Sequence, residues 1–190
     1  MALQKVGLCR QREGGSMLYI EDNKLVLREE NVAIPDHFAT VLHGRAEKMY
    51  KSGRFRCAEA VVRSFIDVTD QKQLRPLVAM ASGFGVGMEN SRSLCGALAG
   101  GVLVLGMLFG RDKPGDAKVD RCQKLAGELH DVFVKKHGSA ICCALVEGLA
   151  DGSPEREERC ALYCADAAAM LGTIVEREWF SGACCQIGGH

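Results

Sequence analysis

The chain has 190 residues, of which 47% are hydrophobic and 25% are charged, an ordinary balance for one globular domain. Its 24 basic and 24 acidic residues cancel, and no basic run is interleaved with aromatic residues. These features argue against a nucleic-acid-binding protein and against attachment to an anionic membrane surface.

The first predicted element is a β-hairpin over residues 17–27, within an N-terminal extension of residues 1–35. Two short β-prone runs flank Asp22 and Asn23, residues that tolerate the positive φ of a tight turn. A two-stranded ribbon is marginal alone in water, so we expect it to pack on the rest of the chain or to pair with a second copy in a homodimer. The first fifteen residues lack the apolar core of a secretory signal, which favours a cytoplasmic location.

Three helices are predicted before the glycine-rich part of the chain, over residues 36–53, 55–69 and 76–83. Asp36 is a candidate cap for the first, and Pro76 suits the first turn of the third. Cys57 lies near the start of the second helix, whose apolar residues recur at helical spacing.

The uncharged segment 94–110 predicts the central helix. It has only seventeen residues, of which five are glycine, and a membrane-spanning helix needs roughly 20 apolar residues. We therefore expect a buried helix in a bundle, with pairs of glycines four residues apart, such as Gly96 and Gly100 or Gly106 and Gly110, letting neighbouring backbones come close. Cys95 falls in its predicted first turn, where unpaired N–H groups stabilise a thiolate.

Three further helices are predicted over residues 116–137, 139–149 and 153–178. The first is amphipathic, and Cys122 belongs to its apolar stripe. The second carries Cys142 and Cys143, which point about 100° apart, so that one can face a site while the other packs. On the third, Cys160 and Cys164 lie one turn apart on the same face.

The predicted fold is therefore mainly all-α, a bundle of about six helices around the glycine-rich helix, preceded by the hairpin. The helical domain would span residues 36–178. Residues 179–190 are glycine-rich, carry Cys184 and Cys185, and are expected to form a flexible tail.

The ten cysteines are the main chemical signal, because a reducing cytoplasm disfavours structural disulfides and favours metal binding or redox chemistry. The chain has no Cys-x-x-Cys, which removes thioredoxin-like, ferredoxin-like and zinc-ribbon patterns, and no Cys-x-x-Cys-His for covalent haem. His130 and His137 are a heptad apart on one predicted helix, a spacing more typical of surface or core-edge histidines than of ligands.

An ordered series of motifs resembles the family named for its C–GCAxxG–C–C cysteine pattern, whose members are described as redox-active. The resemblance covers most of residues 38–172 and is carried by residues 56–61, 83–88, 95–100, 142–148 and 160–168. It implies that the family cysteines are Cys57, Cys95, Cys142 and Cys160, with Cys143 as an alternative to Cys142. The roles of Cys122, Cys164, Cys184 and Cys185 are left open by it.

Four thiolates from separate helices match the Cys₄ requirement of an iron–sulfur cluster, with Gly96 beside it, in a protein that exchanges electrons with a redox partner. They could equally hold zinc or form two dithiol pairs, although structural zinc sites usually draw paired ligands from short knuckles. A second hypothesis is a thiol–disulfide or sulfur-carrier enzyme with Cys95 as a low-pKa nucleophile. A third is a helical assembly protein with structural zinc or buried free cysteines.

Overall fold

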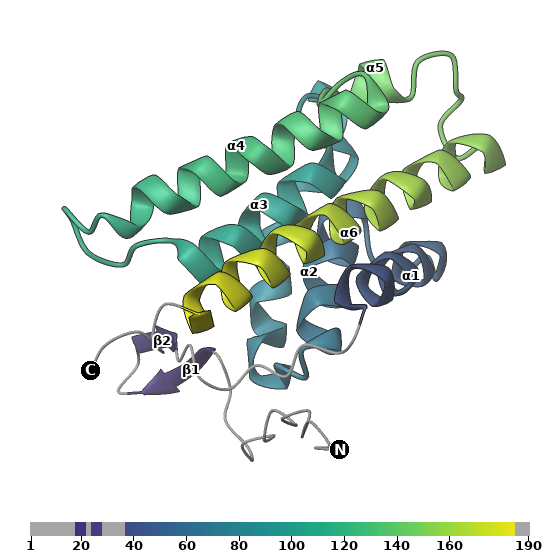
Figure 1. The fold of residues 1–190 in the computed structure, drawn as a ribbon. Coiled ribbons are helices and arrows are strands. Elements are labelled where there is room, and N and C mark those ends of the chain that lie inside the picture. Colours follow the sequence, from purple (N-terminus) through teal and green to yellow (C-terminus); the bar gives the residue numbers. More distant parts are fainter. Residues whose placement is uncertain (1–17, 22–23, 28–36, 185–190) are drawn as a thin grey trace, which may run out of the picture.

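The computed structural model describes residues 18–21, 24–27 and 37–184 of the chain, and these residues are mostly helical (Figure 1). The predicted mainly all-α class is therefore confirmed. The α-helices are α1 Phe38–Lys51, α2 Cys57–Val68, α3 Gly96–Phe109, α4 Lys118–His137, α5 Cys142–Leu145 and α6 Pro154–Cys184. Two 3₁₀ segments, η1 Lys72–Gly87 and η2 Glu89–Ser91, lie between α2 and α3.

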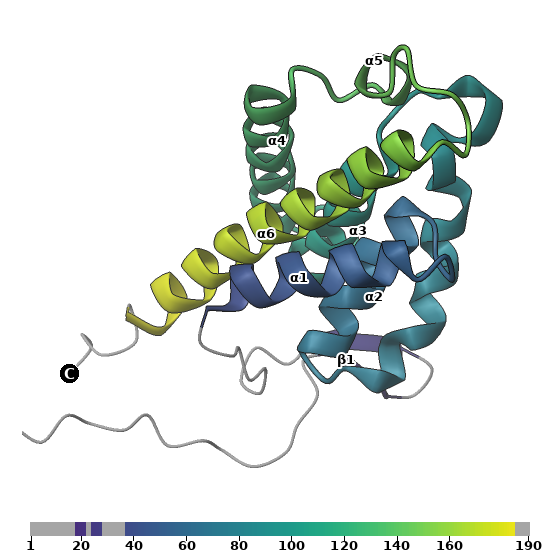
Figure 2. The same ribbon diagram turned by 90° about the vertical axis from the view of Figure 1, so that its right-hand side faces the viewer.

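Helix α3 packs against α2, α4, α6 and η1, which places it in the middle of the bundle as predicted. Helix α6 runs alongside α1 and crosses α3, while α4 packs against both α3 and α6 (Figures 1 and 2). At Gly100 an added Cβ would lie 2.6 Å from the carbonyl oxygen of Ala58, so α2 and α3 come as close as the glycine spacing suggested. The same expectation is wrong at Gly106, where an added Cβ would meet nothing within 4 Å.

Two predicted helices differ from the observed ones for identifiable reasons. The third is a 3₁₀ segment that begins at Lys72 and is kinked at Gly85 and Val86, where the backbone leaves helical geometry. The helix predicted over residues 139–149 shrinks to the four residues of α5. Ala140 and Ile141, at its predicted start, pair instead with the chain just before α3. The helix therefore begins only at Cys142.

At the C-terminal end, α6 continues to Cys184 instead of stopping at 178, so the first part of the predicted tail is helical. Residues 185–190, with Cys185, lie outside the described residues. In the described part of the chain, none of the helices combines the length and hydropathy that crossing a bilayer requires.

Two short strands precede the bundle, β1 Leu18–Glu21 and β2 Lys24–Leu27, and they pair antiparallel with Leu18 opposite Leu27. The predicted turn at positions 22–23 lies outside the described residues, as does the candidate cap Asp36. The hairpin as a unit, its packing on the rest of the chain and its pairing with a second copy therefore stay predictions.

Candidate functional site

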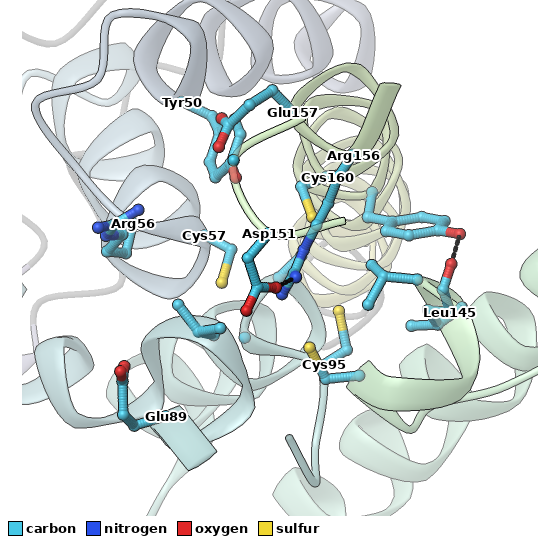
Figure 3. Close-up of a pocket in the computed structure, with 17 residues that line it drawn as sticks. Tyr50, Arg56, Cys57, Glu89, Cys95, Leu145, Asp151, Arg156, Glu157 and Cys160 are labelled. Atoms are coloured by element: carbon cyan, nitrogen blue, oxygen red, sulfur yellow. Dashed lines mark hydrogen bonds and ion pairs between the residues drawn. The ribbon is translucent and has the colours of Figure 1, made fainter. Parts of the chain in front are cut away.

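A cavity of about 300 Å³ lies where α2, α3 and α5 begin and where α6 has made its first turns (Figure 3). Cys57, Cys95, Cys142 and Cys160 all line it. The labelled thiols of Cys57, Cys95 and Cys160 come from three different elements and point towards the same space (Figure 3). We call this space the cysteine cavity. It brings together four residues that are spread over more than half of the sequence.

A short antiparallel pairing sets Cys95 beside Cys142. The N–H of Cys95 donates to the carbonyl of Ala140 at 2.8 Å, and the N–H of Cys142 donates to the carbonyl of Ser93 at 2.5 Å. The two segments then diverge into separate helices, with Cys95 capping α3 and Cys142 opening α5. Cys95 thus precedes the first helical turn in which it was predicted.

Gly96 makes room for Cys57. A Cβ at residue 96 would overlap the sulfur of Cys57 and would lie 2.6 Å from the carbonyl oxygen of Phe84. The first residue of α2 therefore rests against the first residue of α3, and a side chain at position 96 would displace either the thiol or the η1 backbone.

The remaining cysteines lie in different surroundings. Cys164 is fully buried, does not line the cavity, and donates through its sulfur to the carbonyl of Cys57 at 3.7 Å. Cys143 is exposed, so Cys142 is the member of the pair that reaches the cavity. Cys122 donates to the carbonyl of Leu105 at 3.8 Å within the contact between α3 and α4. No disulfide joins the seven cysteines whose side chains the structure describes.

Burial governs the acidity of Cys95, Cys142 and Cys160. It raises the pKa of Cys95 to about 12, although the backbone N–H groups of Leu98 and Ala97 act in the opposite direction. Burial likewise raises the pKa of Cys160 to about 11 and raises that of Cys142. The prediction that a helix start makes Cys95 a low-pKa thiol is therefore wrong, because loss of solvent outweighs two N–H contacts. A metal binding here would have to displace protons from the sulfurs.

Charged side chains close one side of the cavity. Arg156 is buried, lines the cavity and pairs with Asp151, which also pairs with Arg92 from the segment before α3 (Figure 3). The charge of Arg156 lowers the pKa of both Cys142 and Cys160, against the larger effect of burial. The sequence analysis missed Arg156. Its position one turn before Cys160 on the same helix was the available signal.

Tyr50 of α1 is a second residue that the sequence analysis missed. It lines the cavity (Figure 3). Hydrogen bonding with Tyr50 lowers the pKa of Cys160, against the larger effect of burial. The ring of Tyr50 packs against the hydrophobic core, and its hydroxyl gives no periodic signal in the sequence.

The segment between η1 and α3 has an unusual backbone where it touches the cavity. Val86, Met88, Glu89 and Arg92 all have φ between 41° and 63°. Left-handed geometry at residues other than glycine costs on the order of 1–3 kcal/mol each. Gly87, also left-handed, fits where a Cβ would lie 2.5 Å from the Cβ of Cys142, so the segment is folded tightly against this cysteine.

His130 and His137, the two histidines of α4, do not line the cavity. His137 packs between Phe133 and Tyr163, with ring centroids 4.7 and 4.8 Å away, and its Nε2 lies 3.1 Å from Asp166. His130 is exposed beside Asp131. Over the described residues, no three or more His, Cys, Asp or Glu side chains are grouped closely enough to hold a single metal ion.

The family comparison identifies the series of cysteine motifs. A model of the family described as "Putative redox-active protein (C_GCAxxG_C_C)" matches residues 55–174. The chain belongs to this family. The match begins two residues before Cys57 and extends beyond Cys160, so all four cavity cysteines of this family member lie within it.

A search of the solved structures finds the same fold in the split-Soret cytochrome c from Desulfovibrio desulfuricans ATCC 27774, which is described as containing a novel iron centre. The similarity covers 76% of this chain and 70% of that chain, with a TM-score of 0.62 and 19% sequence identity. No curated protein matches the chain.

Proposed function

We propose that this family member carries electrons through an iron–sulfur cluster bound by Cys57, Cys95, Cys142 and Cys160. The observation that carries the proposal is the convergence of these four cysteines on one cavity. Such a cluster, when bound, supplies one-electron redox chemistry. The protein would act in the cytoplasm and exchange electrons with a partner protein.

The donor set and the structural comparison favour a cluster over zinc. Four thiols meet the Cys₄ requirement of common clusters, and all four line one cavity of about 300 Å³. The iron centre described for the split-Soret cytochrome c, which shares the fold, adds support for iron. Zinc remains the alternative metal, in a structural role.

The surrounding charges would offset those of four thiolates. Cys57 and Cys95 lie at the starts of α2 and α3, and the positive end of a helix stabilises nearby negative charge. Arg156 adds a buried cation on the α6 side, part of whose charge is balanced by its partner Asp151. Cys95 and Cys142 are buried, and burial is one of the factors that set the reduction potential of a cluster.

A dithiol function is the second candidate, because the pairing of residues 92–95 with 140–143 sets Cys95 and Cys142 side by side. Their oxidation would form one S–S bond and release two protons and two electrons to a disulfide-bearing partner. The raised pKa of Cys95 opposes its role as the attacking nucleophile, in this reaction or in sulfur transfer.

The test is an anaerobic purification with the absorption spectrum, iron, zinc and acid-labile sulfide measured on one sample. We expect a brown protein with iron and sulfide in comparable amounts. Serine at any cavity cysteine should remove most of the iron, whereas Cys122→Ser and Cys143→Ser should retain it. A colourless, iron-free protein that cannot be reconstituted overturns the proposal, and stoichiometric zinc in its place favours the structural alternative.

A further inference from the structure

A groove between α1 and α2 has a local excess of positive charge. Arg45 and Lys48 from α1, Arg54 from the connecting turn and Arg63 from α2 line it, against the single carboxylate of Asp67. We call this feature, with a volume of about 370 Å³, the α1–α2 groove. The whole chain has no net charge, so the excess belongs to this surface and not to the protein in general.

The one carboxylate in the groove is already engaged. Asp67 accepts hydrogen bonds from Arg45 at 2.8 Å and from Arg63 at 2.9 Å, and Arg75 lies 3.7 Å from it. Lys48 and Arg54 are exposed, and within the described residues neither side chain has an ion-pair partner. Lys48 and Arg54 are therefore solvent-exposed cations without an ion-pair partner among the described residues. They lie beside Asp67, which already interacts with three arginines.

The groove and the cysteine cavity lie on either side of the same turn. Met49 lines the groove and Tyr50 lines the cavity, although they are neighbours on α1. On the other arm of the turn, Phe55 lines the groove and Cys57 the cavity, and the guanidinium of Arg63 lies 5.6 Å from the Phe55 ring centroid. A protein seated on the groove would come within two residues of a proposed cluster ligand.

We propose that the α1–α2 groove is the docking surface for an acidic partner protein that exchanges electrons with the cysteine cavity, an inference that rests on the proposed function. In the exchange a reduced iron–sulfur or flavin protein loses one electron and the cavity site gains one, with no atom or proton transferred. Opposite charge on the two surfaces increases the rate of encounter between the proteins.

The surroundings favour a protein over a small anion such as phosphate. The groove is flanked by the second half of α1 and the second half of α2. Compact phosphate sites commonly use the N–H groups of a helix start, and no helix begins among the residues that line this groove. Its cations instead spread over two helices and a turn, which suits a surface that carries several carboxylates.

The test uses a plant-type ferredoxin as the acidic probe and basic cytochrome c as its counterpart. The variant K48E/R54E reverses the two unpaired cations of the groove. The control K118E/K124E makes the same change of charge on exposed lysines of α4, which packs on α3 and α6 and lies away from α1 and α2 (Figure 2). Calorimetric titration at low and high salt measures binding without requiring any cofactor.

We expect the wild-type protein and the control to bind ferredoxin at low salt, with affinity falling as salt rises, and K48E/R54E to bind it about tenfold or more weakly. We expect K48E/R54E to bind cytochrome c at least as strongly as the wild-type protein does. Absence of ferredoxin binding, or equal loss in both variants, overturns the proposal. Saturable pyrophosphate binding that needs Lys48 and Arg54, without ferredoxin binding, overturns it in favour of a small-anion site.

Iron analysis separates this inference from the proposed function. If the protein lacks iron and sulfide but still binds ferredoxin through the groove, the electron-carrier proposal fails while the docking surface stands. If the protein contains the cluster and ferredoxin binding ignores Lys48 and Arg54, the docking surface fails while the electron carrier stands.

Discussion

Gly96 and Cys57 are packed so closely that a methyl group on residue 96 would occupy the space of the Cys57 sulfur. The contact joins the first residue of α3 to the first residue of α2. A glycine in the family motif is thereby tied to the position of a cysteine from another part of the chain.

Gly96→Ala should therefore displace the Cys57 sulfur. We expect lost iron binding and a decrease of about 1–3 kcal/mol in the free energy of unfolding, because the added methyl group overpacks the contact. Urea unfolding and iron analysis measure the two effects. Gly106→Ala on the same helix meets open space and should keep iron and stabilise the protein by up to about 1 kcal/mol. Equal iron content and equal stability of the two variants would contradict the proposed steric role of Gly96.

Tyr50→Phe should alter the potential of the proposed cluster without removing it. The substitution deletes the hydroxyl that is hydrogen-bonded to Cys160. Such a bond stabilises the more negative, reduced state, so its loss should lower the midpoint potential by about 20–60 mV, equivalent to about 0.5–1.5 kcal/mol. Redox titration followed by absorption provides the measurement.

The matched control for that variant is Tyr163→Phe. The Tyr163 hydroxyl donates to the carbonyl of Leu145 at 2.8 Å and not to a sulfur. We expect this change to reduce stability by about 1 kcal/mol or more and to leave the potential nearly unaltered. The same shift of potential in both variants would exclude the specific role of Tyr50.

Met88→Gly should stabilise the protein. Met88 is 41% exposed and has a φ of 63°, so glycine relieves backbone strain at little cost in packing, with an expected gain of about 1 kcal/mol. Met80 is also exposed but lacks a positive φ, and Met80→Gly should destabilise η1. Chemical unfolding of the two variants side by side tests whether the left-handed segment is strained.

His137 should make the fold sensitive to acid. Burial lowers the pKa of His137 below its ordinary value of 6.5, with Asp166 acting in the opposite direction. Below pH 6.5 the unfolded chain therefore takes up the proton more readily than the folded one, and stability falls as pH decreases towards the folded-state pKa.

His137→Gln should flatten the dependence of unfolding free energy on pH in that range. His130→Gln changes an exposed histidine paired with Asp131 and should leave the slope as it is. Unfolding curves from pH 7 to pH 5 provide the comparison, and an unaltered slope in His137→Gln would remove His137 as the source of the effect.

The sequence by itself determined the helical class, because apolar spacing and helix punctuation are local properties. The long helices α1, α2, α4 and α6 begin close to their predicted starts, since each carries an apolar face. It also determined the family, because an ordered series of cysteine and glycine motifs survives in the linear chain even where overall identity to proteins of the same fold is low.

Only the tertiary structure decided which chemistry those residues can support. The backbone pairing of residues 92–95 with 140–143 shortened α5 and placed Cys95 beside Cys142. Long-range backbone hydrogen bonds of this kind leave no periodic signal in a sequence. The acidity of Cys95 also depended on tertiary packing, because solvent loss comes from neighbours that its own segment does not encode. The roles of Arg156 and Tyr50 also depended on tertiary packing, because it places both side chains at the cysteine cavity.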